Sequence, residues 1–235
     1  MSSWKKFLPD YEIKLWNEDT FDFNQNNFVK QAYENKKWAF VADYARLKAL
    51  SEYGGLYLDT DMEITKNISH ILEDECFLGV EDSGLVNAAV IWAKRPHNEF
   101  IDKLIGQYKN INEFEIKDIY AMTIPRQITK MLEPLGFNKY KQEIQVFFNG
   151  NLKVYPREFF YPLSYDYQNN KFTDNSCMIH HYDATWASKP EKVKLFFRRH
   201  NMEYMMRTVD ICVSIKIRIK RILNRIRGIQ NEKKY

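Results

Sequence analysis

The sequence lacks any apolar run of about eighteen residues, so no segment is predicted to cross a bilayer as a helix. The opening residues, Met1 to Lys6, contain no apolar stretch of the kind that directs secretion. Cysteine is scarce: Cys76, Cys177 and Cys212 lie far apart and form neither a CxxC pair nor an even set. A reduced, cytoplasmic compartment is therefore expected.

Charge is distributed unevenly along the 235 residues. From Lys189 onwards there are 14 Lys and Arg against 4 Asp and Glu, out of 35 and 31 in the whole chain. Residues 1–188 consequently hold 21 basic and 27 acidic side chains. An acidic body followed by a basic tail indicates that the tail meets an anionic surface.

The hydrophobic pattern of the body predicts strands that alternate with helices. Apolar residues at helical spacing predict a helix over Trp38–Tyr53, which Gly54 and Gly55 are expected to end. Short apolar or alternating runs predict strands at 11–16, 56–58, 77–80 and 87–93, and further helices are expected at 98–109 and 125–135. This order is typical of an α/β layered domain.

The basic tail carries isoleucines at helical spacing, namely Ile211, Ile215, Ile219, Ile222, Ile226 and Ile229. Lys and Arg occupy the other helical faces, so a basic amphipathic helix is predicted. One interpretation places residues 204–235 in the plane of an anionic membrane surface. The alternative is a helix that packs on its own domain or on a second subunit.

Two aspartates, Asp59 and Asp61, follow the predicted strand at 56–58 and are separated by Thr60. At the end of a strand both carboxylates can reach one divalent cation. Carboxylate oxygens suit Mn²⁺ or Mg²⁺, especially when substrate phosphates supply further ligands. A diphosphate leaving group needs such a cation because negative charge builds on it as the glycosidic bond breaks.

The segments Val41–Leu47 and Tyr53–Met62 resemble the core of glycosyltransferase family 32, which includes capsular-polysaccharide transferases, yeast mannosyltransferases and relatives of clostridial glucosylating toxins. Weaker similarity runs from about Ser3 to Lys189. The resemblance implies a domain of the GT-A type, with a Rossmann-like mixed sheet, over residues 1–190. The basic helical tail is expected over residues 191–235.

The resemblance also implies roles for the residues around the two aspartates. Asp61 is expected to bind the metal, and Asp59 to lie near the metal, the ribose and the sugar. Asp43 and Arg46 are expected to hold the donor sugar, and Tyr57 is expected among the substrate-binding residues. From the residues alone, Asp43 and Arg46 also fit a surface salt bridge three residues apart on a helix.

A second motif, Ile179 to Trp186, resembles the late His-His…Ser-Trp segment of the family. By that comparison a histidine or the hydroxyl of Thr185 completes the metal and diphosphate shell, and Trp186 donates its indole N–H to the leaving phosphate. Adjacent histidines in an extended chain point to opposite sides. We therefore expect one of the pair to face the metal, His181 being slightly preferred over His180.

Asn87 is expected either to contact the donor sugar or acceptor or to serve as a turn residue before the strand at 87–93. Family members usually begin with a central strand upstream of the segment that starts here at Ser3 and Trp4. That first strand has no counterpart in this sequence, which puts nucleotide affinity in question.

The function expected is retaining transfer of a hexosyl unit from a nucleotide-diphosphate sugar, preferably a UDP-sugar, to a glycan or lipid-linked glycan. The setting is capsular or surface polysaccharide synthesis, with the protein cytoplasmic or peripheral at the inner face of the membrane, and without nucleic acid. A carboxylate nucleophile and direct front-face attack both stay open. The alternatives are a metal-dependent phosphohydrolase and a non-catalytic remnant that binds a membrane or a partner.

Overall fold

The structure is a computed structural model that describes the chain except residues 18, 110–121, 185–186 and 233–235, and except the side chains of 221, 222 and 224–232. Contacts divide it into two compact units. Unit 1 comprises residues 1–165 and 169–183, and unit 2 comprises residues 166–168 and 184–235. The domain boundary predicted at residue 190 stays a prediction.

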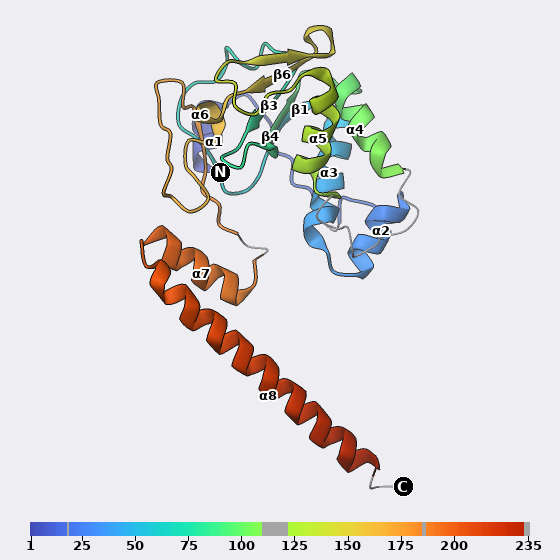
Figure 1. The fold of residues 1–235 in the computed structure, drawn as a ribbon. Helices are drawn as coiled ribbons and strands as arrows, with labels where there is room; N and C mark the ends of the chain where they lie inside the picture. The colour runs from blue at the N-terminus through green and yellow to red at the C-terminus, as the bar shows by residue number, and fades with distance from the viewer. Residues whose placement is uncertain (18, 110–121, 185–186, 233–235) are drawn as a thin grey trace. The chain divides into compact units, whose positions relative to one another are not determined.

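Unit 1 is built on a mixed sheet, as the sequence predicts (Figure 1). Its strands run in the order β1 (Gly55–Leu58), β4 (Val86–Ala93), β3 (Cys76–Val80), β6 (Leu152–Tyr155) and β5 (Gln145–Phe147). The β3–β6 pair is parallel and the other neighbours are antiparallel. A separate antiparallel pair joins β2 (Met62–Ile64) to β7 (Met178–His180).

Strand β4 is buried on both of its sides, because other elements, including helices, cover both faces of this sheet. One face packs against α2 (Asn27–Glu34), α3 (Trp38–Tyr53), α4 (Glu99–Lys109) and α5 (Ile124–Leu132). On that face Ile91 and Ala93 join the core, whereas Val90 and Trp92 point to the other face. That second face contains residues of β2, β7 and α6 (Arg157–Phe160), and Trp4 and Phe7 of α1 (Ser2–Phe7) pack against it.

The turn from α3 to β1 fixes where the two aspartates lie. Gly54 and Gly55 both adopt positive φ angles, of 64° and 94°, which other residues rarely take. A Cβ added at Gly54 would lie 2.9 Å from the carbonyl oxygen of Ala93, so the turn also needs a residue without a side chain. The chain then enters β1, which ends directly before Asp59.

Most elements of the body agree with the sequence-based expectations. The helix over Trp38–Tyr53 is confirmed, and the strands and helices expected from residue 56 to 135 occur with small shifts of their ends. The strand expected at 11–16 is wrong, because these residues form no ladder. Their side chains pack instead on Tyr53, whose ring lies 5.7 Å from that of Trp16 and 4.5 Å from Lys14 Nζ.

Unit 2 contains α7 (Lys189–Arg199), a short 3₁₀ turn (Glu203–Met205) and α8 (Met206–Glu232). A capping box formed by Ser188 and Glu191 begins α7. Helix α7 packs against α8, and Lys194 pairs with Asp210 between them. Among the described residues no helix is both long and apolar enough to cross a membrane. The amphipathic role of α8 stays a prediction.

Candidate metal and sugar site

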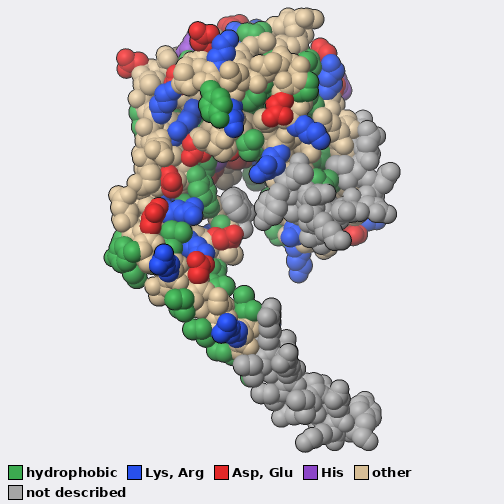
Figure 2. Space-filling model, in the orientation of Figure 1, with side chains coloured by type: hydrophobic (Ala, Val, Ile, Leu, Met, Phe, Trp, Pro, Cys, Tyr) green, Lys and Arg blue, Asp and Glu red, His purple; other side chains and the backbone are tan. Residues whose placement is uncertain are grey.

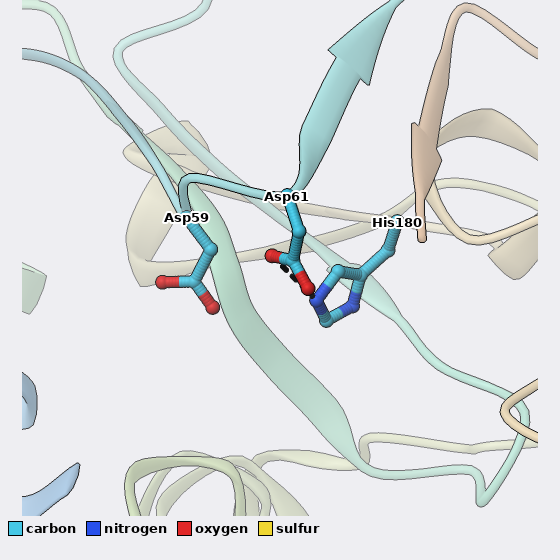
Figure 3. A group of neighbouring side chains, drawn as sticks. All are labelled: Asp59, Asp61 and His180. Atoms are coloured by element: carbon cyan, nitrogen blue, oxygen red, sulfur yellow. Dashed lines mark ion pairs between the residues drawn. The ribbon is translucent and has the colours of Figure 1, made fainter. Parts of the chain in front are cut away.

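Asp59, Asp61 and His180 are brought together by the ends of three strands (Figure 3). Asp59 follows β1, and its backbone N–H donates to the Ala89 carbonyl of neighbouring β4 at 2.8 Å. Asp61 precedes β2, whose first residue, Met62, pairs with His180 of β7. The antiparallel β2–β7 pair therefore carries His180 to the aspartates from more than a hundred residues away in sequence.

The donor set of this group fits a divalent cation. One ligand atom from each of Asp59, Asp61 and His180 lies within 4.8 Å of the others. Two carboxylates and an imidazole are ligands that Mn²⁺ and Mg²⁺ accept, with carboxylate oxygens the better match for Mg²⁺. Nε2 of the His180 ring faces Asp61, and the buried Nδ1 has no hydrogen-bond partner among the described residues.

Asp61 is ionised at neutral pH. Burial disfavours its charge, but His180 and the backbone N–H of Asp183 outweigh that effect and lower the pKa of Asp61 to about 2. His180 Nε2 lies 3.3 Å from Asp61 Oδ1, and the Asp183 N–H donates to Oδ2 at 2.9 Å. The carboxylate is thus held in its charged form and in a fixed orientation.

The two adjacent histidines point to different partners. His180 is largely buried beside Asp61, with its ring 4.0 Å from that of Tyr182. His181 is half exposed, and its Nε2 lies 2.8 Å from Glu63 Oε2. The sequence slightly favoured His181 as the ligand, whereas the structure places His180 in the group, because the register of β7 against β2 decides which side faces Asp61.

Arg46 links helix α3 to the two strands of the site. Its Nη1 lies 3.1 Å from Asp59 Oδ1 and donates to the carbonyl of Ala88 at 2.8 Å, and its Nη2 lies 3.2 Å from Asp43 Oδ1. The guanidinium carbon lies 4.7 Å from the centre of the Tyr57 ring. Burial opposes its charge, but Tyr57 and the two aspartates raise the pKa of Arg46 above its ordinary value.

Asp43 and Tyr57 complete this cluster. Burial raises the pKa of Asp43 despite the attraction of Arg46, and its Oδ2 accepts from the Ile124 N–H at 3.4 Å. Tyr57 donates its hydroxyl to Asp59 Oδ1 at 2.6 Å. The four residues Asp43, Arg46, Tyr57 and Asp59, all expected near the donor from the resemblance, therefore form one unit joined by ion pairs and a hydrogen bond beside the metal-binding group.

Asn87 lies at the start of β4, where its side-chain amide is used within the protein. Its Oδ1 accepts from the Ala89 N–H at 2.7 Å, and its Nδ2 donates to Glu81. Thr185 and Trp186, proposed for the diphosphate shell, lie outside the described residues.

Two tyrosines near His180 were missed by sequence reasoning. The ring of Tyr161 lies 5.9 Å from His180, and its hydroxyl accepts from the Val90 N–H at 3.2 Å. The ring of Tyr182 lies 4.0 Å from that of His180, and the backbone of Tyr182 has a positive φ of 52°. The position of Tyr182 next to the histidine pair was a usable signal, but nothing local in the sequence marks Tyr161.

Comparison with known proteins agrees with this geometry. Residues 1–78 match the family described as "glycosyltransferase sugar-binding region containing DXD motif". An uncharacterised glycosyltransferase of Acanthamoeba polyphaga mimivirus is 24% identical over 83% of this chain and 78% of its own length. No solved structure matches the chain.

Two eukaryotic relatives are similar over a smaller part of their own sequences. A human alpha-1,4-N-acetylglucosaminyltransferase is 27% identical over 68% of this chain, and a mannosyl phosphorylinositol ceramide synthase of Saccharomyces cerevisiae is 26% identical over 70%. The matches cover 44% and 43% of those proteins, so the chain spans less than half of their length.

Proposed function

Because the chain is a glycosyltransferase like those of family 32, we propose that it moves a hexosyl unit from a nucleotide-diphosphate sugar to a glycan or lipid-linked glycan. The observation that carries this proposal is the convergence of Asp59, Asp61 and His180 beside the buried Arg46 cluster. The first group suits a metal-bound diphosphate, and the second suits sugar hydroxyls. We propose a UDP-sugar donor and retention at the anomeric carbon.

Asp59, Asp61 and His180 would hold Mn²⁺ or Mg²⁺. When bound, the cation neutralises charge on the diphosphate as it leaves. Asp61 needs no proton removed to bind it, because its carboxylate is already ionised well below neutral pH. His180 would bind through a neutral imidazole nitrogen.

The Arg46 cluster would bind the donor sugar. Asp43 accepts hydrogen bonds and Arg46 donates them, so together they recognise the alternating hydroxyls of a hexose. Arg46 and Tyr57 also hold Asp59 in place through its Oδ1. Among the described residues no hydrogen bond or ion pair uses Asp59 Oδ2, which can therefore bind ribose, sugar or cation. Sugar and metal binding are thereby coupled through one carboxylate.

Isothermal titration with UDP-glucose, UDP-galactose, UDP-N-acetylglucosamine and GDP-mannose, with and without Mn²⁺, tests the donor site. N-acetylglucosamine and mannose belong in the panel because the names of two relatives contain them. We expect one donor to bind only with Mn²⁺, and Asp61→Ala to abolish that binding. Asp174→Ala, which removes an exposed carboxylate, should leave it unchanged.

Absence of binding by a folded chain would contradict the proposal and favour the non-catalytic alternative. Hydrolysis of the donor to a nucleoside monophosphate and a sugar 1-phosphate, without sugar transfer, would favour a metal-dependent phosphohydrolase. Chromatography of the nucleotide products separates the two outcomes in one set of samples.

We also propose that α8 lies on an anionic membrane surface at the site of surface polysaccharide synthesis, with the protein peripheral at the inner face. Ile211, Ile215 and Ile219 are each more than half exposed, whereas Met206 and Val213 on the opposite side are half-buried. Packing of α7 against α8 thus leaves the isoleucines uncovered within unit 2.

The positive charge of α8 favours an anionic membrane over a second copy of the same helix as its partner. Figure 2 shows hydrophobic and basic side chains together along its described part, and Lys216, Arg218 and Lys220 are all exposed. Two copies of the helix would bring like charges together, whereas anionic headgroups neutralise them. The yeast relative named for a ceramide product is consistent with a lipid-linked acceptor.

Co-sedimentation of the full chain with vesicles tests this surface. We expect binding to phosphatidylglycerol-containing vesicles, little binding to phosphatidylcholine alone, and weakening by salt. Ile215→Asp should reduce binding about 10-fold or more. Ile217→Asp is the matched control, because Ile217 is similarly exposed but lies off the isoleucine stripe. Equal binding by both variants would contradict the proposal.

A further inference from the structure

Glu81 is a carboxylate beside the site that the metal and the Arg46 cluster do not use. It follows β3 at the start of the turn to β4. Ser83 Oγ donates to Glu81 Oε1 at 2.6 Å, and Asn87 Nδ2 donates to Oε2. An ionised carboxylate offers about four lone-pair positions. Two are therefore used by the protein, and acceptor capacity remains on both oxygens.

A chain of hydrogen bonds connects Glu81 to the Asp-Thr-Asp segment. Asn87, which donates to Glu81, accepts from the N–H of Ala89, and the carbonyl of Ala89 accepts from the N–H of Asp59. Strands β1 and β3 both pair antiparallel with β4 and therefore run in the same direction, so Asp59 and Glu81 follow their strands at the same end of the sheet. His180 is also close enough for its charge to affect Glu81.

The environment of Glu81 disfavours the ionised form of its carboxylate, which is unexpected for a residue with a purely structural role. The side chain is partly buried, and burial raises its pKa although Ser83 and Asn87 act in the opposite direction. Asp82 adds negative charge beside Glu81, and the charge of His180 acts in the opposite direction. A partly buried carboxylate in such surroundings beside a cluster of ionisable groups is a candidate for binding a ligand. A glutamine at this position would hold the turn without that charge.

We infer that Glu81 binds a hydroxyl of a sugar substrate through its remaining lone pairs, and that Ser83 and Asn87 are its positioning residues. This inference rests on the proposed transferase function. It gives Asn87 an indirect role that differs from both roles expected from the sequence, a direct substrate contact and a turn residue. Because both ends of its amide are bonded within the protein, Asn87 acts on the substrate through Glu81.

The hydroxyl belongs either to the donor hexose or to the acceptor, and the two sources give different results. Glu81→Gln keeps the shape of the side chain but removes acceptor capacity. Its affinity for the UDP-hexose that binds the wild type with Mn²⁺ is measured by titration. Its rate of transfer to a panel of octyl glycosides is measured by mass spectrometry. We expect a loss of about 10- to 100-fold in one of these quantities.

Substitution of Ser83 tests whether this residue positions the Glu81 carboxylate. Ser83→Ala should lower the same quantity by about 3- to 10-fold, whereas Ser83→Thr keeps the hydroxyl and should restore it. Glu143→Gln is the matched control, because Glu143 is strongly exposed. Thermal unfolding of each variant tests whether the fold is retained.

A loss of donor affinity assigns the hydroxyl to the donor, and a loss of transfer with unchanged donor affinity assigns it to the acceptor. Wild-type values for both quantities in folded Glu81→Gln would overturn the inference. Failure of the wild type itself to bind any donor would instead overturn the proposed function, so the two failures are distinguishable.

Discussion

Arg46 and Asp59 form a largely buried ion pair that joins helix α3 to the end of β1, with Nη1 3.1 Å from Oδ1. The same guanidinium contacts Asp43, so one cation neutralises two carboxylates. A single residue thereby stabilises the α3–β1 connection and sets the orientation of a ligand of the candidate metal site. Substitutions here should affect folding and binding together.

Arg46→Ala is predicted to destabilise unit 1 by about 2–4 kcal/mol, because it leaves two partly buried carboxylates without their cation. Urea denaturation measures this change. Arg95→Ala provides the control, since Arg95 is paired with Glu75 at an exposed position and should change stability by less than about 1 kcal/mol. Similar losses for both variants would show that the Arg46 pairs contribute little.

The two histidines should differ strongly in their effect on Mn²⁺ affinity. His180→Ala removes a side chain of the metal-binding group and is predicted to weaken Mn²⁺ binding by at least about 10-fold. His181→Ala removes the half-exposed pair with Glu63, outside the metal-binding group, and should change Mn²⁺ affinity by less than about 3-fold. Titration of Mn²⁺ followed by electron paramagnetic resonance measures both, and the reverse order would assign the ligand to His181.

Local sequence was sufficient to predict α3, β1 and the aspartates that follow, because helical spacing, Gly54 and a short apolar run each specify local structure. It was insufficient to choose between His180 and His181. Alternation along a strand shows that neighbours point apart, but only the pairing of β2 with β7 determines which one faces Asp61.

Long-range packing explains the other differences. The alternating residues 11–16 satisfy the strand pattern, yet a strand requires a ladder partner, and these side chains pack on Tyr53 instead. Tyr161 reaches His180 from a different part of the chain, so no local pattern could reveal it.

The contribution of Asp61 to stability should depend on pH with a defined sign. Its pKa falls from 3.8 to about 2 on folding, so the ionised group stabilises the protein above pH 3.8 and this stabilisation is lost as pH falls towards 2. We expect Asp61→Asn to cost about 1–2 kcal/mol at pH 7 in metal-free buffer. The difference from wild type should shrink below about pH 4. Urea denaturation at several pH values measures it, and a difference that grows on acidification would contradict the assignment.

Gly54 and Gly55 allow steric overlap to be separated from backbone strain. Both have positive φ, but a Cβ at Gly54 would lie 2.9 Å from the backbone of Ala93 and Arg95, whereas a Cβ at Gly55 meets nothing within 4 Å. Gly55→Ala should therefore cost only the conformational strain, about 1–2 kcal/mol. Gly54→Ala adds a clash with backbone that cannot rotate away, so we expect a loss at least about 2 kcal/mol larger.

Gly54→Ala should also weaken binding at the candidate metal site, because relief of the clash has to move β1 against β4. Asp59 follows β1 directly and is held to Ala89 by its backbone, so displacement of the strand separates it from Asp61 and His180. Thermal unfolding together with Mn²⁺ titration tests both effects. Gly54→Ala should weaken Mn²⁺ binding even where the protein is folded, and Gly55→Ala should not. Equal Mn²⁺ affinity in the two variants would mean that the glycine turn stabilises the fold without setting the position of Asp59.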